Sequence, residues 1–227
     1  MGHGNLYNMT RKLNGDIKSS MSIKEFCEAR GIKRVCHFTS LENLKGIFKE
    51  GYIYSTEELL YRKLDFIRND PSRFDRNLVG ISCSITTPNK RLLYRWFNDN
   101  WDDCVILCID PKILSRLCTF FPTNAAVESG SFGGQDLSGL ERLFSISNRH
   151  PNLSDDRPTD MQAEVMVKDR IPLRLILGIY VYSNWTKNQV GDLINEFIPS
   201  CPLQVATNKN FFIQTGEDLN FWRKWSG

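Results

Sequence analysis

The stretch that decides how this chain folds is Asp160-Met161-Gln162-Ala163-Glu164-Val165-Met166-Val167, late in a sequence of 227 residues. Side chains alternate along a β-strand, so Gln162, Glu164 and Met166 share one face and the residues between them share the other. A glutamate at the mouth of an apolar strand is either an edge residue facing water or part of a site. A second stretch far upstream favours a site.

That second stretch is Val35-Cys36-His37-Phe38-Thr39, which also has the character of a strand. His37 and Thr39 lie two residues apart, so both side chains project from the same face. A lone strand histidine is either a satisfied structural residue or a ligand-binding one. Because an imidazole beside a hydroxyl can hydrogen-bond a ribose or a carboxamide, we expect this strand and the Glu164 strand to meet across a ligand-binding cleft.

Composition indicates an ordinary globular protein. The chain is 41% hydrophobic and 24% charged, with a net charge of +3, which suits one domain with one core and does not by itself indicate nucleic-acid binding. We expect a flexible polar leader over residues 1–20 and a single domain over residues 21–227. Seven cysteines without CxxC spacing, and three histidines without HxxxH or HExxH spacing, disfavour a metal site and fit a reducing cytoplasm. No apolar run is long enough to span a bilayer, and the N-terminus does not resemble a secretory signal.

Periodicity and capping residues predict a mixture of helices and strands. Helices are expected over residues 23–30, 41–50, 57–69, 91–98, 111–117, 137–144 and 187–197. Strands are expected over residues 32–38, 52–55, 79–85, 104–109, 164–171, 175–181 and 203–206. The order indicates an α+β fold with a mixed or antiparallel sheet. Residues 123–160 are weakly regular, and long segments of that kind are usually functional or mobile.

Several further polar and aromatic residues are candidates for a site. The segment 70–76 carries Arg73 and Arg76, whose guanidinium groups suit a pyrophosphate unless the segment is simply a solvated charged loop. In Tyr52-Ile53-Tyr54 an aromatic ring could stack on a planar ligand or pack against a helix. The remaining candidates are Ser82 and Ser84, which share one face of a strand, Arg91, Tyr94 and Arg95 on one helix, and Asn124 in a turn.

The order of these motifs resembles the DarT family of bacterial toxins, which are NAD-dependent ADP-ribosyltransferases that modify DNA bases. The resemblance covers about residues 22–184, and its most specific part is the His37-x-Thr39 strand combined with the Gln162-Ala163-Glu164 strand. It also rests on Asn43-Leu44, Asp70-x-x-Arg73-x-Asp75, Ser82-Cys83-Ser84-Ile85, Pro88-Asn89, Tyr94, Asn124-Ala125-Ala126 and Ile171-Pro172.

The resemblance implies an ADP-ribosyltransferase fold, a split and twisted sheet flanked by helices, with NAD+ in the central cleft and no metal. It makes Glu164 the catalytic glutamate, with Arg73 as a second catalytic residue that holds phosphate or the bound base. The residues implied to contact NAD+ are His37, Thr39, Asn43, Tyr54, Ser84 and Tyr94. The residues implied to contact DNA are Arg76, Arg91, Arg95 and Asn124.

The implied reaction is the transfer of one ADP-ribose to a base in single-stranded DNA, with guanine favoured over thymine because of Pro88-Asn89 and Asn124-Ala125-Ala126. The implied setting is a cytoplasmic toxin–antitoxin or phage-defence system with an antitoxin of the macrodomain or a related ADP-ribosyl-glycohydrolase type. The residues leave other functions open. These are an RNA- or protein-directed ADP-ribosyltransferase, an NAD glycohydrolase, and a catalytically silent nucleotide- or nucleic-acid-binding module.

Overall fold

The computed structural model describes residues 21–68, 79–126, 133–147, 149–215 and 218. The expected leader over residues 1–20 and the candidate residues Arg73 and Arg76 lie outside the described residues. Within the described ranges, no helix has the length and apolar character needed to cross a membrane.

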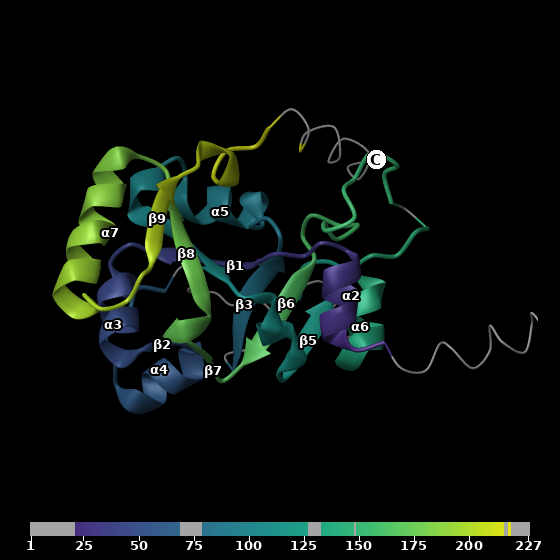
Figure 1. Cartoon of the computed structure of the whole chain (residues 1–227), viewed down its shortest axis with the longest axis horizontal. Helices are drawn as coiled ribbons and strands as arrows, with labels where there is room; N and C mark the ends of the chain where they lie inside the picture. The colour runs from purple at the N-terminus through teal and green to yellow at the C-terminus, as the bar shows by residue number, and fades with distance from the viewer. Residues whose placement is uncertain (1–20, 69–78, 127–132, 148, 216–217, 219–227) are drawn as a thin grey trace, which may run out of the picture.

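A seven-stranded sheet with the order β5-β6-β3-β1-β4-β8-β9 forms the centre of the molecule (Figure 1). Neighbouring strands are antiparallel except β8 and β9, which are parallel. The strands are β1 (Val35–Ser40), β3 (Gly80–Ile85), β4 (Cys104–Ile109), β5 (Cys118–Phe121), β6 (Glu164–Lys168), β8 (Ile176–Val181) and β9 (Gln204–Thr207). A separate two-stranded sheet pairs β2 (Tyr52–Tyr54) with β7 (Arg170–Pro172). The predicted α+β class with a mixed, mostly antiparallel sheet is confirmed.

The central sheet is split between β1 and β3. Although both strands have six residues, their register contains only the pairs Val35↔Ile85 and Cys36↔Ser84. On the other side, β1 pairs with β4 along all six of its residues, and β3 pairs with β6 over four residues. Each half of the sheet is therefore regular in itself, and the two halves diverge beyond Cys36 on β1.

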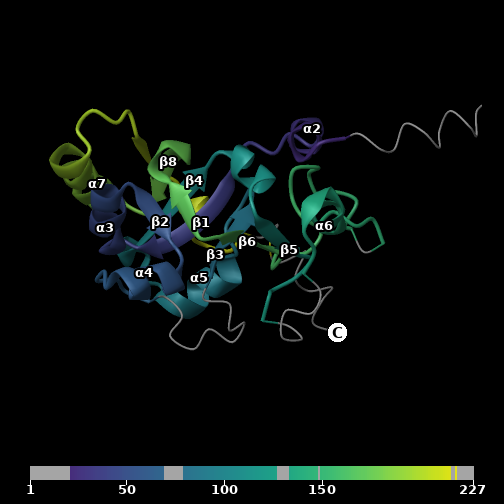
Figure 2. The ribbon, with the colours of Figure 1, turned by 90° about the horizontal axis from the view of Figure 1, so that it is seen from below.

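Helices flank the sheet at both ends and on both faces. They are α2 (Ile23–Ala29), α3 (Asn43–Glu50), α4 (Thr56–Arg62), α5 (Lys90–Phe97), α6 (Asp136–Arg142) and α7 (Asn184–Phe197), with short 3-10 turns at η2 (Trp101–Asp103), η3 (Pro111–Ser115), η5 (Leu173–Leu175) and η6 (Lys209–Phe211). Figure 1 shows α3 and α7 at the β9 end of the sheet and α2 and α6 at the β5 end. Figure 2 shows α5 below β1 and β3.

The core follows the alternation of side chains along the strands. On β4, Val105 and Leu107 join the main cluster with α3 and α7, whereas Cys104 and Ile106 join a second cluster under α5. All six β4 residues are buried, as predicted for a central strand. Burial raises the pKa of the Cys118 thiol to about 12, so this cysteine behaves as a small protonated core residue.

Some helix and strand ends lie where the sequence predicted them, and others do not. Ser22 and Glu25 form a capping box at the start of α2, where the helix was expected to begin. The next helix, α3, begins at Asn43 and not at the expected residue 41, because β1 extends to Ser40. Lys63, at φ 56° in the left-handed region, stops α4 well before the predicted end at residue 69. The short strand β5 was not predicted.

The irregular segment before β6 is organised around one side chain. The guanidinium group of Arg149 donates to the backbone carbonyls of Leu153, Ser154 and Arg157 at 3.5, 2.6 and 2.8 Å. The Thr86 hydroxyl donates to the Asp156 carbonyl at 2.7 Å, which ties the same segment to the end of β3. These contacts fix the approach of the chain to Glu164 at the start of β6.

A buried ion pair joins the start of α5 to the C-terminal part of the chain. Lys90 Nζ lies 2.5 Å from Asp218 Oδ2, with the two side chains 4% and 2% exposed. Thr215 also donates to Asp218 from its backbone N–H and its hydroxyl, each at 2.8 Å. Burial alone would raise the pKa of Asp218, but the hydrogen bonds from Lys90 and Thr215 outweigh it and lower that pKa below its ordinary value.

Lys90→Met should lower the free energy of unfolding by up to about 3–5 kcal/mol, because it leaves the buried Asp218 carboxylate with only the more distant Arg157 guanidinium, at 3.9 Å, as a cationic partner. The folded-state pKa of Asp218 is depressed, so the ionised carboxylate stabilises the fold at pH values above its ordinary pKa of about 3.9. This stabilisation is lost as the pH falls through the folded-state pKa. The difference in the free energy of unfolding between wild type and Lys90→Met should therefore become smaller below about pH 4. Urea denaturation across pH 3–7 measures this.

The matched control is Lys112→Ala, because the Lys112–Asp110 pair is on the surface with the lysine side chain 74% exposed. Its effect should stay below about 0.5 kcal/mol. Equal effects of the two substitutions at pH 7 would contradict the assigned role of the buried pair.

Candidate active site

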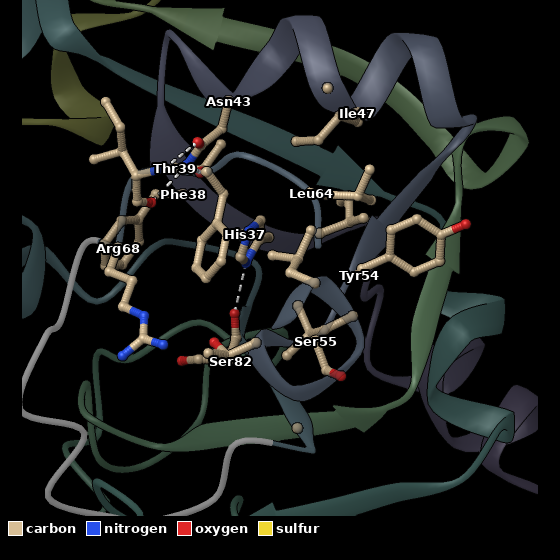
Figure 3. A pocket seen from close by; sticks show the side chains of 18 of the residues that line it. His37, Phe38, Thr39, Asn43, Ile47, Tyr54, Ser55, Leu64, Arg68 and Ser82 are labelled. Carbon is tan, nitrogen blue, oxygen red and sulfur yellow. Dashed lines mark hydrogen bonds between the residues drawn. The ribbon is translucent and has the colours of Figure 1, made fainter. Parts of the chain in front are cut away.

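A cavity of about 560 Å³ opens where the central sheet splits. Its walls come from the diverging parts of β1 and β3, from α3, α5 and β2, and from the start of β6. The segment 64–68 lines it as well (Figure 3). Sites for small molecules and cofactors usually have volumes of about 300–1,000 Å³, so this cavity is large enough for a dinucleotide-sized ligand to be considered.

His37 bridges the two halves of the sheet at the cavity. Its Nδ1 lies 2.8 Å from the backbone carbonyl oxygen of Ser82 (Figure 3). A carbonyl can only accept, so Nδ1 carries a proton and donates it to Ser82. The His37 side chain thus replaces a backbone hydrogen bond between the two strands that the split removes.

Glu164 lies at the base of the cavity as the first residue of β6 and is 6% exposed. The Ser82 hydroxyl donates to its Oε1, and the backbone N–H of Ala125 donates to its Oε2 at 2.9 Å. Hydrogen bonds to both oxygens hold the carboxylate in one orientation and offset part of the cost of burying it. As the alternation predicted, Met166 lies on the same side of β6 and also lines the cavity.

Asn43 holds the wall of the cavity opposite β3. Its Nδ2 donates to Thr39 Oγ1 and to the Ile67 carbonyl, both at 2.9 Å, and its Oδ1 accepts from the Ile67 N–H at 2.8 Å. The amide therefore pairs with Ile67 as a neighbouring strand would. Thr39 and Asn43 both line the cavity, and together they fix the segment 64–68 over it.

Tyr54 lines the cavity from β2 and is 8% exposed. Its ring stacks on Tyr52 with centroids 5.6 Å apart. The guanidinium groups of Arg62 and Arg170 lie over the two rings, 4.7 Å from the Tyr54 centroid and 4.8 Å from the Tyr52 centroid. This cluster is a rigid aromatic wall at one end of the cavity.

Cationic side chains also line the cavity. On α5, helical spacing brings Leu92, Arg95 and Trp96 to the cavity on one face. Arg68, on the segment that Asn43 fixes, lines the cavity too, as do Lys45 and Lys49 of α3. Neither Arg68 nor the two lysines was selected from the sequence, because nothing in a local pattern shows that these segments close over the same space.

The structure brings together seven of the residues to which the family resemblance gives a role and leaves others apart. Those that line the cavity are His37, Thr39, Asn43, Tyr54, Arg95, Asn124 and Glu164. Ser84 lines a separate, much smaller depression, because β3 pairs with β1 at that position and the split has closed. Tyr94 is half exposed on α5 and contacts Trp101, and Arg91 is exposed without lining the cavity.

Ser82 is the residue that the sequence left undecided. It shares a strand face with Ser84, and alternation alone cannot say which serine reaches the site. The structure places the Ser82 hydroxyl on Glu164 and its carbonyl on His37. No group of three or more histidine, cysteine, aspartate or glutamate side chains with a metal-binding arrangement occurs among the described residues.

Solved structures share this fold. Thermus sp. 2.9 DarT in complex with NAD+ matches with a TM-score of 0.59 and 15% identity, over 80% of this chain and 98% of that chain. The same protein in complex with ADP-ribosylated ssDNA matches with a TM-score of 0.63 and 16% identity, over 81% and 97%. Thermosipho africanus DarTG in complex with ADP-ribose matches with a TM-score of 0.58 and 15% identity, over 79% of this chain and 51% of that chain. A comparison with curated protein sequences found no match.

The split sheet with a cavity at the divergence of β1 and β3 is therefore the fold of an ADP-ribosyltransferase. A family model described as "ssDNA thymidine ADP-ribosyltransferase, DarT" matches residues 36–213. The chain belongs to the DarT family, a family of NAD+-dependent ADP-ribosyltransferases that act on single-stranded DNA.

Ser82→Ala should lower the rate of NAD+ consumption about 10- to 100-fold, because Glu164 loses the hydroxyl that orients Oε1 while the Ser82 carbonyl still accepts from His37. Ser82→Thr keeps the hydroxyl and should retain most of the rate. Steady-state kinetics with release of nicotinamide measures both.

Ser84→Ala is the matched control, since this serine lies on the same strand face but outside the cavity. It should leave the rate within about twofold of wild type. An equal loss in the two alanine variants would mean that β3 tolerates no substitution, and the positioning by Ser82 would then have no support.

Proposed function

We propose that this protein transfers a single ADP-ribose from NAD+ to a base in single-stranded DNA, with Glu164 as the catalytic glutamate. The observation that carries the proposal is the Glu164 carboxylate, buried at the base of the cavity with both oxygens engaged. Membership of the DarT family and the size of the cavity support it.

NAD+ supplies the ADP-ribosyl group: the bond between ribose C1′ and nicotinamide breaks, nicotinamide leaves with the electron pair, and positive charge develops on the ribose. Glu164 is a fixed negative charge at the site where that charge develops, so it stabilises the transition state more than the ground state. A nitrogen of the acceptor base forms the new bond to C1′ and loses its proton, and Glu164 is the group that accepts the proton.

Other side chains divide the binding of NAD+ between them. His37 and Thr39 line one wall of the cavity and would contact a ribose or the carboxamide of NAD+ by hydrogen bonds. Tyr54 belongs to the aromatic wall at one end of the cavity, against which the nicotinamide ring would pack. Arg68 lines the cavity and provides a guanidinium group for the pyrophosphate. The family resemblance gives Arg73 a similar role in holding phosphate or the bound base.

Arg95 and Asn124 line the cavity and are the residues that would contact the DNA. A base stacked inside a duplex cannot reach a buried carboxylate, so the acceptor must be single-stranded or flipped out of its stack. The sequence motifs favour guanine, whereas the description of the family model names thymidine, and both bases are therefore tested below.

The biological setting is part of the proposal. One structural relative is DarTG, and an enzyme that modifies DNA bases would damage its own cell unless a partner protein controlled it. We infer an antitoxin partner that restrains the enzyme or removes the ADP-ribose, of the macrodomain or a related ADP-ribosyl-glycohydrolase type. Its place of action would be the bacterial cytoplasm, where DNA and NAD+ occur together.

Glu164→Gln should reduce transfer by at least about 10²- to 10³-fold, because the amide keeps the size of the side chain and removes its charge. The protein is incubated with NAD+ and four single-stranded oligonucleotides, each lacking one base, and the products are weighed by mass spectrometry. Wild type should add one ADP-ribose to every strand except the one that lacks the acceptor base.

Circular dichroism and thermal stabilisation by NAD+ serve as the controls for Glu164→Gln, since a ligand that binds only the native state raises its stability. Normal transfer by a folded Glu164→Gln protein would refute the catalytic assignment. If wild type releases nicotinamide while no strand gains mass, the protein is a glycohydrolase or uses another acceptor, and DNA transfer fails.

A further inference from the structure

Asn124 directly precedes Ala125, the residue whose backbone contacts the proposed catalytic carboxylate. The turn after β5 carries Ala125, which is 1% exposed and donates its backbone N–H to Glu164 Oε2 at 2.9 Å. Ala125 also packs with Phe121 and Met166 in a small apolar cluster that fixes the turn. Asn124 lines the same cavity as Glu164.

The orientation of the Asn124 amide follows from its one hydrogen bond. The backbone N–H of Ala126 lies 2.8 Å from one terminal atom of the side chain. Because a backbone N–H can only donate, that atom is the oxygen Oδ1, and the other is the amide nitrogen Nδ2. Within the part of the chain that the structure describes, Nδ2 makes no hydrogen bond. The group that Asn124 presents to a ligand is therefore a donor.

The other side-chain amide that lines the cavity is not available in the same way. Asn43 donates both Nδ2 hydrogens, one to Thr39 and one to the Ile67 carbonyl, and accepts the Ile67 N–H at Oδ1. Among the described residues that line the cavity, Asn124 is thus the amide whose donors can be given to a ligand.

We propose that Asn124 selects the acceptor base by donating from Nδ2 to a ring carbonyl oxygen, so that the enzyme takes keto bases and rejects amino bases. Thymine O4 and guanine O6 are acceptors, whereas cytosine N4 and adenine N6 carry donors at the equivalent positions. An amino base would bring two sets of donors together and leave both unsatisfied, which costs more than losing a hydrogen bond. The inference rests on the proposed function and assigns its acceptor to one chemical class, to which both thymine and guanine belong.

Asn124→Asp tests the inference with almost no change of shape. A carboxylate oxygen can still accept from the Ala126 N–H and preserve the turn, while the second oxygen becomes an acceptor in place of the donor. The variant should lower the preference for keto over amino bases about tenfold or more. An overall loss of DNA affinity through charge repulsion does not disturb this ratio, because it affects all strands alike.

Binding is measured in the Glu164→Gln protein saturated with NAD+, which separates recognition from chemistry. Fluorescence anisotropy gives the dissociation constants of single-stranded heptanucleotides that differ only in a central thymine, guanine, cytosine or adenine. The same four strands are then used to compare transfer rates of the Asn124→Asp variant with those of wild type. Since the intrinsic reactivities of the bases are common to both enzymes, a change in the ratio of rates reports on residue 124.

Asn208→Asp is the matched control. Asn208 also accepts a backbone N–H two residues on, from Asn210 at 3.2 Å, and it does not line the cavity. This substitution should leave the base preference within about twofold, and neither variant should change the dissociation constant for NAD+ by more than about twofold.

The inference is overturned if Asn124→Asp keeps the wild-type preference, or if the protein with Asn124 shows no preference for keto bases. If strands with keto bases bind more tightly, Asn124→Asp removes that preference and no strand is modified, base selection by Asn124 stands and the proposed transferase function fails. If NAD+ binds and no strand binds, the inference is wrong while an NAD+-directed activity remains.

Discussion

The site depends on one interaction, the hydrogen bond from His37 Nδ1 to the Ser82 carbonyl across the split of the central sheet. β1 and β3 share only two register pairs, at Val35 and Cys36 of β1. Beyond that point their backbones no longer satisfy each other, and a side chain takes over. The imidazole gives the Ser82 carbonyl a donor that the diverging β1 backbone does not provide, and it lines the cavity.

The split produces a rigid cavity because each half of the sheet is anchored separately. β1 is fixed by its full-length pairing with β4, and β3 by its pairing with β6. Glu164 belongs to the second half and is oriented by Ser82 and Ala125 before any ligand arrives. Charge that is already in place when the transition state forms requires no reorganisation, which is the property that such catalysis needs.

Much of this arrangement could be predicted from the sequence. Alternation placed Glu164 and Met166 on one face of β6, and the order of motifs indicated the family and the split sheet. The choice between Ser82 and Ser84 could not be made, since both project from one face of β3 and only the point at which β1 diverges distinguishes them. Tyr94 shows a similar limit, because helical spacing relates residues to each other but not to the cavity, and Leu92, Arg95 and Trp96 face it instead. Arg68 reaches the cavity only because Asn43 pairs with Ile67, a contact between segments 24 residues apart.

A crystal structure of the Glu164→Gln protein with NAD+ tests the central claim most directly. The account predicts NAD+ in the cavity between the diverging ends of β1 and β3, with the nicotinamide-bearing ribose against residue 164 and His37 still donating to the Ser82 carbonyl. NAD+ bound elsewhere, or bound with residue 164 away from that ribose, would contradict the assignment of this split as the catalytic site.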